Sequence, residues 1–201
     1  MNSQYSRAVS KIVLGLLAIY FFYVFVKAIE VANRRHISTD DGVYINSTNS
    51  SEDIKKLAER LTKNCSSQLC EVENILNYVT NIPYRVNNYQ AHSPQDTIQK
   101  NFGDCDDKSN LLISLLHAKE LKSYFVLVPK HIFVIVSHRH TPLPFPKKGL
   151  YINGEKFYIL ESTAKNSTIG FPLHYHLHEI KAIIEPFSNK KIDISTLKWK
   201  L

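Results

Sequence analysis

A cysteine, a histidine and a glutamate lie at three separate places in this sequence where they can form a thiol active site. Cys105 follows Gly103-Asp104 at the expected start of a helix in GDCDDKSNLL, His131 begins the run HIFVIVS, and Glu161 lies in KFYILES. A thiol attacks a carbonyl group as the thiolate, which a helix N-terminus stabilises and a neighbouring histidine generates. A carboxylate can orient that histidine. These residue types therefore predict nucleophilic attack on an acyl carbon.

The cysteine and the histidine also have purely structural interpretations. Cys105 fits a half-buried helix cysteine, and His131 fits a histidine at the edge of a strand. Asp106 and Asp107 oppose thiolate formation by raising the thiol pKa, although acids also suit the first turn of a helix. The chemical interpretation requires the strands that carry His131 and Glu161 to pair antiparallel, so that both residues reach one end of the sheet.

The elements that must position these residues follow from hydrophobic periodicity. Apolar residues and capping signals at helical spacing predict helices at 51–63, 70–82, 94–100 and 105–119. Runs of β-branched and aromatic residues predict strands at 123–129, 131–137 and 156–162, with a proline-rich loop at 138–150. Helices come first and strands second, which indicates an α+β domain with helices packed on an antiparallel sheet.

The N-terminal segment predicts a membrane anchor. Residues 8–29 form an almost wholly apolar stretch of about 22 residues, which spans a bilayer at about 1.5 Å per residue. A cleaved signal peptide is the alternative, but no small-x-small cleavage pattern follows the stretch. We expect an anchor at 1–32, a polar linker at 33–50 and a folded domain at 51–201.

The remaining cysteines bear on the side of the membrane. Cys65 and Cys70 are close enough around a helix start to form a short disulfide, although two unrelated thiols are the alternative. Basic residues flank the apolar segment almost equally, so the positive-inside rule leaves its orientation open. A disulfide places the folded domain in an oxidising compartment, and we therefore expect a single-pass protein with an extracytoplasmic C-terminal domain.

Composition limits the partners. Charged residues make up 21% of the chain and hydrophobic residues 44%, as in a globular protein, and the net charge is +7. The basic residues are scattered, so nucleic acid is not an expected partner. His174, His176 and His178 share one face if extended and would suit zinc, but no fourth ligand lies nearby. We expect no metal and no cofactor.

Three motifs in order give the sequence a family resemblance. GDCDDKSNLL, VPKHIFVIV and FYILESTAKNSTIG resemble the transglutaminase-like superfamily, whose core has a papain-like fold with a cysteine, a histidine and an aspartate in that chain order. The resemblance covers residues 51–172 and includes the lead-in NYVTNIPY, which ends at Tyr84. Small membrane-anchored prokaryotic members, which carry a paired cysteine before the lead-in helix, are most similar.

The resemblance implies a role for each site residue. Cys105 matches the nucleophile, His131 the general base and Glu161 the orienting acid, where the family usually has aspartate. Gln99 and Tyr84 are candidates for a second oxyanion donor. The implied activity is cleavage or transfer of protein or peptide amides through a thioester, and the absence of extra β-domains favours hydrolysis over cross-linking. The alternatives are a non-catalytic protein-binding module on the same scaffold and a structural membrane protein.

Overall fold

The chain divides into two units, Met1–Arg34 and Arg35–Leu201. The computed structural model describes residues 2–32, 35–40, 42–87, 91–138, 143 and 145–201. The described part of the first unit is helix α1 (Asn2–Ala32), in which Arg7–Val26 has a mean hydropathy of 2.2 and is not buried within the protein. Its length and composition suit a membrane span, and a signal sequence would meet the same criteria.

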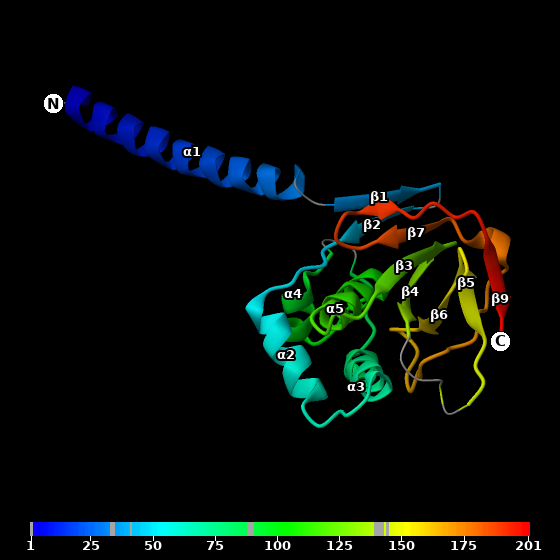
Figure 1. Cartoon of the computed structure of the whole chain (residues 1–201). Helices are drawn as coiled ribbons and strands as arrows, with labels where there is room; N and C mark the ends of the chain where they lie inside the picture. Colours follow the sequence, from blue (N-terminus) through cyan, green and yellow to red (C-terminus); the bar gives the residue numbers. More distant parts are fainter. Residues whose placement is uncertain (1, 33–34, 41, 88–90, 139–142, 144) are drawn as a thin grey trace. The chain divides into compact units, whose positions relative to one another are not determined.

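The described part of the second unit packs helices against one face of an antiparallel sheet (Figure 1). The helices are α2 (Glu52–Thr62), α3 (Gln68–Asn81), α4 (Pro94–Lys100), α5 (Cys105–His117) and the 3₁₀ turn η1 (Leu177–Glu179). The strands are β1 (Arg35–Thr39), β2 (Gly42–Asn46), β3 (Ser123–Val128), β4 (His131–Ser137), β5 (Gly149–Ile152), β6 (Glu155–Leu160), β7 (Ala182–Glu185), β8 (Lys190–Lys191) and β9 (Leu197–Lys200). The predicted α+β class is confirmed.

The large sheet has a buried core on each of its faces. Its strands run in the order β8-β7-β3-β4-β6-β5-β9, and all neighbours are antiparallel. Ile132, Val134 and Val136 face the helices, whereas Phe133 and Ile135 face the other side, as the alternation in β4 predicts. The second face is covered by half-buried side chains of the C-terminal segments, including Tyr175 and Trp199.

Helix α5 is the central helix of the unit. Every residue from Asp107 to Leu116 is buried, so its polar side chains must find partners inside the protein. Lys108 donates to the Ile82 carbonyl at 2.7 Å. The Asn110 side chain donates to the carbonyl of Ile45 at 2.8 Å and accepts the Ser47 N–H at 2.8 Å. These bonds tie the helix to elements on several sides of it.

The linker expected at 33–50 is corrected by the structure, because β1 and β2 form an antiparallel hairpin there. Ile37 and Tyr44 are buried in the main core. The Arg35 guanidinium donates to the carbonyls of Pro186 and Phe187 at 3.0 and 2.9 Å. Contacts with residues far along the chain stabilise this hairpin, and the local sequence does not reveal them.

Cys65 and Cys70 form a disulfide with their Cα atoms 5.4 Å apart, and Cys105 is a free cysteine. The expected loop at 138–150 already includes the start of β5. Strands β7, β8 and β9 were not predicted, since each is at most four residues long and they join the sheet through pairing of β7 with β3 and of β9 with β5, both distant in sequence.

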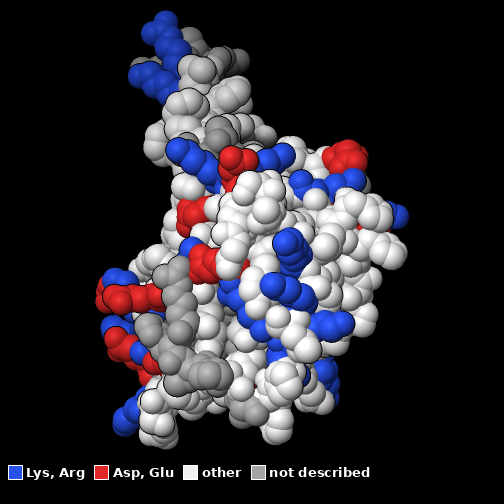
Figure 2. Space-filling view, turned by 45° about the vertical axis from the view of Figure 1, so that its right-hand side comes forward, with Lys and Arg blue, Asp and Glu red and all other residues white. Residues whose placement is uncertain are grey.

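Charge is unevenly distributed along the second unit. Residues 122–201 contain twelve Lys and Arg against five Asp and Glu, whereas residues 51–121 contain eight against ten. In the view of Figure 2, acidic side chains gather along one side of this unit, and basic side chains are spread across the visible face. The strand-rich half therefore carries most of the positive charge.

Replacing Asn110 with alanine should destabilise the fold. The change leaves the half-buried Ile45 carbonyl and Ser47 N–H without this partner, which costs about 1–3 kcal/mol. Urea unfolding of the full chain in detergent micelles, followed by the emission of Trp199, measures the loss. Asn77→Ala on the exposed face of α3 is the control and should change stability by less than about 0.5 kcal/mol. Equal stability of the two variants would contradict the role of Asn110.

Candidate active site

The candidate nucleophile, Cys105, is the first residue of α5 and is half-buried. Asp104 caps the helix: its side chain accepts the Asp107 N–H, and the Asp107 side chain accepts the Asp104 N–H in return. The backbone N–H of Ile132, the residue after His131, lowers the pKa of the Cys105 thiol and so favours the thiolate. The thiol therefore lies at the start of β4, beside the candidate base.

The electrostatics of Cys105 differ from the expectation based on its helix terminus. Burial raises the pKa of the thiol to about 12, and the charges of Asp106 and Asp104 add to the shift. The N–H groups of Ile132 and Asp106 lower it by less. Cys105 is consequently a neutral thiol near pH 7, and it needs a base to become nucleophilic.

The candidate base and acid form a direct pair. His131 Nε2 lies 2.9 Å from Glu161 Oε2. The other carboxylate oxygen, Oε1, accepts the N–H of Thr163 at 3.0 Å and its hydroxyl at 2.6 Å. Burial raises the pKa of Glu161, but the hydrogen bonds from His131 and Thr163 outweigh it, so the net pKa is lowered. Glu161 is therefore ionised, and Nδ1 is the ring nitrogen of His131 left for the thiol.

Strand register explains how a glutamate fills this position. Val134 of β4 lies opposite Leu160 of β6, so continuing the register places Glu161 opposite Phe133. His131 is then the diagonal neighbour of Glu161 on the same face, and diagonal neighbours are separated by about 7–8 Å between Cα atoms. A long carboxylate side chain spans that distance. The extra methylene relative to aspartate is accommodated, because the carboxylate reaches the imidazole.

A buried serine pair links the three chain segments that carry the site. Ser109 lies one turn after Cys105 on the same helix face, and its hydroxyl lies 3.1 Å from the hydroxyl of Ser162, the residue after Glu161. The Ser109 hydroxyl also donates to the carbonyl of Ile132 at 3.5 Å. All three linked residues are buried. This contact fixes the helix relative to both strands directly behind the candidate residues.

The two candidate oxyanion donors have different surroundings. Tyr84 forms a parallel bridge with Gly103, and its pKa is raised by burial and by the charges of Cys105 and Asp104. Its hydroxyl is therefore in the electrostatic field of the thiol. Gln99 is exposed on α4 and makes no recorded contact with the site. Tyr84 remains a candidate, and the structure does not bring Gln99 to the thiol.

Of the two acidic residues after Cys105, Asp107 is buried and Asp106 is half-buried. Burial and the neighbouring Asp104 raise the pKa of Asp106 to about 8. Burial and Asp104 also raise the pKa of Asp107 to about 6, and its Oδ1 accepts the backbone N–H of His92 at 2.6 Å. Asp106 is therefore largely protonated at neutral pH, which weakens its effect on the thiol there.

The histidine-rich segment 174–178 does not form a metal site among the described residues. His174, His176 and His178 are all exposed and alternate with inward residues, as an extended segment predicts. Within the residues that the structure describes, no group of three or more His, Cys, Asp or Glu side chains is arranged to hold a metal ion.

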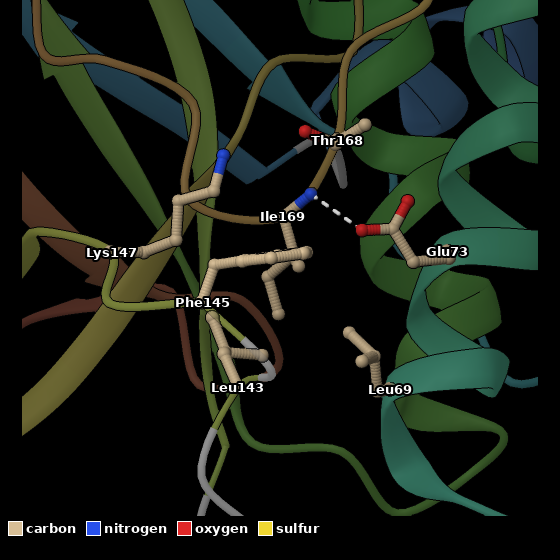
Figure 3. Close-up of a pocket in the computed structure, with 7 residues that line it drawn as sticks. All are labelled: Leu69, Glu73, Leu143, Phe145, Lys147, Thr168 and Ile169. Atoms are coloured by element: carbon tan, nitrogen blue, oxygen red, sulfur yellow. Dashed lines mark hydrogen bonds between the residues drawn. The ribbon is translucent and has the colours of Figure 1, made fainter.

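A separate apolar pocket of about 240 Å³ lies away from these residues (Figure 3). Leu69, Leu143, Phe145 and Ile169 supply most of its wall, with Glu73, Lys147 and Thr168 at its margin. The Ile169 N–H donates to Glu73 at 2.9 Å and joins the 168–169 segment to α3. The pocket shares no lining residue with the candidate active site.

Two solved structures resemble this chain over part of its length. One is a candidate cysteine protease from Cytophaga hutchinsonii. It is 20% identical to this chain, covers 62% of it and superposes with a TM-score of 0.45. This chain spans only 43% of that protein's length. Another match is calcium-bound LapG from Legionella pneumophila, with 14% identity, a TM-score of 0.39, and 73% of this chain and 92% of LapG covered. No curated protein matches the sequence.

The family comparison covers two of the three candidate residues. The model of the transglutaminase-like superfamily matches residues 55–131, which include Cys105 and His131 and stop short of Glu161. This match confirms the resemblance drawn from the sequence motifs, and it identifies this segment of the chain as transglutaminase-like.

Proposed function

We propose that this chain is a thiol enzyme of the cysteine peptidase type that acts on amide groups of a protein or peptide. Cys105 is its nucleophile, His131 its general base and Glu161 the residue that orients the base. The observation that carries this proposal is the partly buried Glu161–His131 pair at 2.9 Å, beside a thiol whose pKa is lowered by the backbone N–H of the next residue of the same strand. The proposed acceptor of the acyl group is water.

The proposed reaction follows from the protonation states. His131 Nδ1 removes the proton from the neutral thiol as the sulfur attacks the amide carbonyl, and Glu161 stabilises the resulting imidazolium. The Cys105 N–H has no partner among the described residues and can donate to the oxyanion. The imidazolium then protonates the leaving amine. Water, deprotonated by His131, hydrolyses the thioester and releases the acid and the free thiol.

We also propose that α1 anchors the enzyme in a membrane with the second unit on the extracytoplasmic side. The apolar length of α1 supports an anchor, and the Cys65–Cys70 disulfide supports an oxidising compartment. A protein or peptide substrate would then meet the site outside the cytoplasm.

His131→Ala should remove the reactivity of the thiol towards acyl donors. Without the imidazole, a thiol whose pKa is about 12 has no base at neutral pH, so acylation should slow by about 100-fold or more. The full chain in detergent micelles is mixed with p-nitrophenyl acetate, and acetylation of Cys105 is followed by intact-protein mass spectrometry. Cys105→Ala defines the background, and His178→Ala, which alters an exposed histidine, is the matched control. Equal acylation of wild type and His131→Ala would favour a non-catalytic binding module.

Substitutions of Glu161 should separate its charge from its length. Glu161→Gln removes the negative charge that stabilises the imidazolium and should slow acylation by about 10³-fold. Glu161→Asp keeps the charge but shortens the side chain, so an intermediate rate is expected. The same acetylation assay ranks the three proteins. A Glu161→Asp variant at least as fast as wild type would show that the carboxylate position is not the determinant.

Asp106→Asn should lower the pKa of the Cys105 thiol. The Asp106 carboxyl ionises near pH 8, and its negative charge then opposes ionisation of the thiol. The neutral amide removes this repulsion. Above about pH 8, where Asp106 is ionised in the wild type, the alkylation rate of the variant should therefore rise at a lower pH than that of the wild type. Iodoacetamide alkylation across a pH series measures the shift. Asp53→Asn on the exposed face of α2 is the control, and coincident profiles for wild type and Asp106→Asn would exclude the interaction.

A further inference from the structure

The segment 171–178 covers the sheet face opposite the helices in an alternating pattern. Phe171, Leu173, Tyr175 and Leu177 pack against that face, and the residues between them are exposed. This alternation brings a tyrosine from well beyond β6 to the end of β4 where His131 lies. The family match ends at residue 131, so Tyr175 lies outside it.

The Tyr175 ring is held beside the candidate base. Its centroid lies 6.4 Å from that of His131 with the planes 18° apart, and 6.5 Å from that of Phe133 with the planes 16° apart. A cavity of only about 20 Å³ separates the segment from Phe133 and Glu161. The ring therefore has little room to move, and it forms a wall of the site next to His131.

The Tyr175 hydroxyl is available to a ligand. It makes no hydrogen bond with any residue that the structure describes. Burial raises its pKa, and the negative charges of Glu161, Glu179 and Cys105 raise it further, which keeps the hydroxyl protonated as a donor. A hydrogen-bond donor in the field of both the thiol and the orienting acid is suited to stabilise negative charge that develops during attack.

We propose that Tyr175 is a catalytic residue of this site, whose hydroxyl donates a hydrogen bond to the acyl oxygen of the substrate as Cys105 attacks. The inference rests on the proposed thiol chemistry and adds a donor that the sequence motifs do not indicate. Tyr84 is the other tyrosine near the thiol, but its side chain is more exposed, and it has no ring contact with His131. The fixed ring of Tyr175 makes it the better placed donor.

The test compares two thiol reagents on the full chain in detergent micelles. Acetylation by p-nitrophenyl acetate develops negative charge on a carbonyl oxygen, whereas dipyridyl disulfide reacts with the same thiol and has no carbonyl group. Tyr175→Phe should slow acetylation by about tenfold to a hundredfold, while its reaction with the disulfide should stay within about twofold of wild type. Tyr124→Phe is the control. Tyr124 packs on the same sheet face, but in β3 it lies opposite Ile135, four residues along β4 from His131, so both rates should stay unchanged.

Each outcome decides for or against the inference. Slowing confined to acetylation in Tyr175→Phe, with unchanged Trp199 emission, supports it. Unchanged acetylation in Tyr175→Phe, with loss in His131→Ala, overturns it and leaves the thiol chemistry standing. Equal slowing with both reagents also overturns it, since that result indicates only a packing role. If the wild-type thiol is not acetylated, or is acetylated as fast in His131→Ala, the thiol chemistry itself is overturned, and the role of Tyr175 with it.

Discussion

The burial of α5 is the constraint on which the rest of this structure depends. A helix that is enclosed from Asp107 to Leu116 must satisfy every polar side chain from within the protein, and its partners come from the hairpin, from α3 and from the segment after β6. Each of these bonds limits translation or rotation of the helix. The first residue of that helix is the thiol, so the packing of α5 fixes the position of Cys105.

The sheet positions the other two candidate residues by register. His131 and Glu161 are diagonal neighbours near one end of adjacent antiparallel strands, and they share the face opposite the helices. The thiol approaches from the helix side and reaches the strand through the Ile132 N–H. Contacts between Ser109, Ser162 and Ile132 lock the two layers directly behind this meeting point. Helix packing and strand pairing therefore converge on the site.

Sequence reasoning predicted the features that depend on local pattern. Capping residues and periodicity gave the helix at 94–100 with its observed bounds, and alternation in β4 gave the correct faces. The hairpin at 35–46 was missed because Arg35 and Asn46 bind carbonyls near residue 186, and polar composition does not report such contacts. Tyr175 was missed for a related reason, since its place beside His131 depends on how a long irregular segment folds back over the sheet.

The thiol shows most clearly where a local rule fails. A helix N-terminus favours the thiolate by about a kilocalorie per mole or less at the surface, whereas burial beside acidic groups raises the pKa of Cys105 to about 12. The larger effect wins, and the resting thiol is neutral.

A neutral resting thiol is consistent with the proposed compartment. Thiol–disulfide exchange proceeds through the thiolate, so a protonated Cys105 reacts slowly with disulfides, including the Cys65–Cys70 bridge of its own chain. On the extracytoplasmic side, a preformed thiolate would be exposed to oxidation and exchange. Reactivity that arises only when His131 takes the proton, with an acyl group in place to accept the sulfur, restricts the thiol to its substrate.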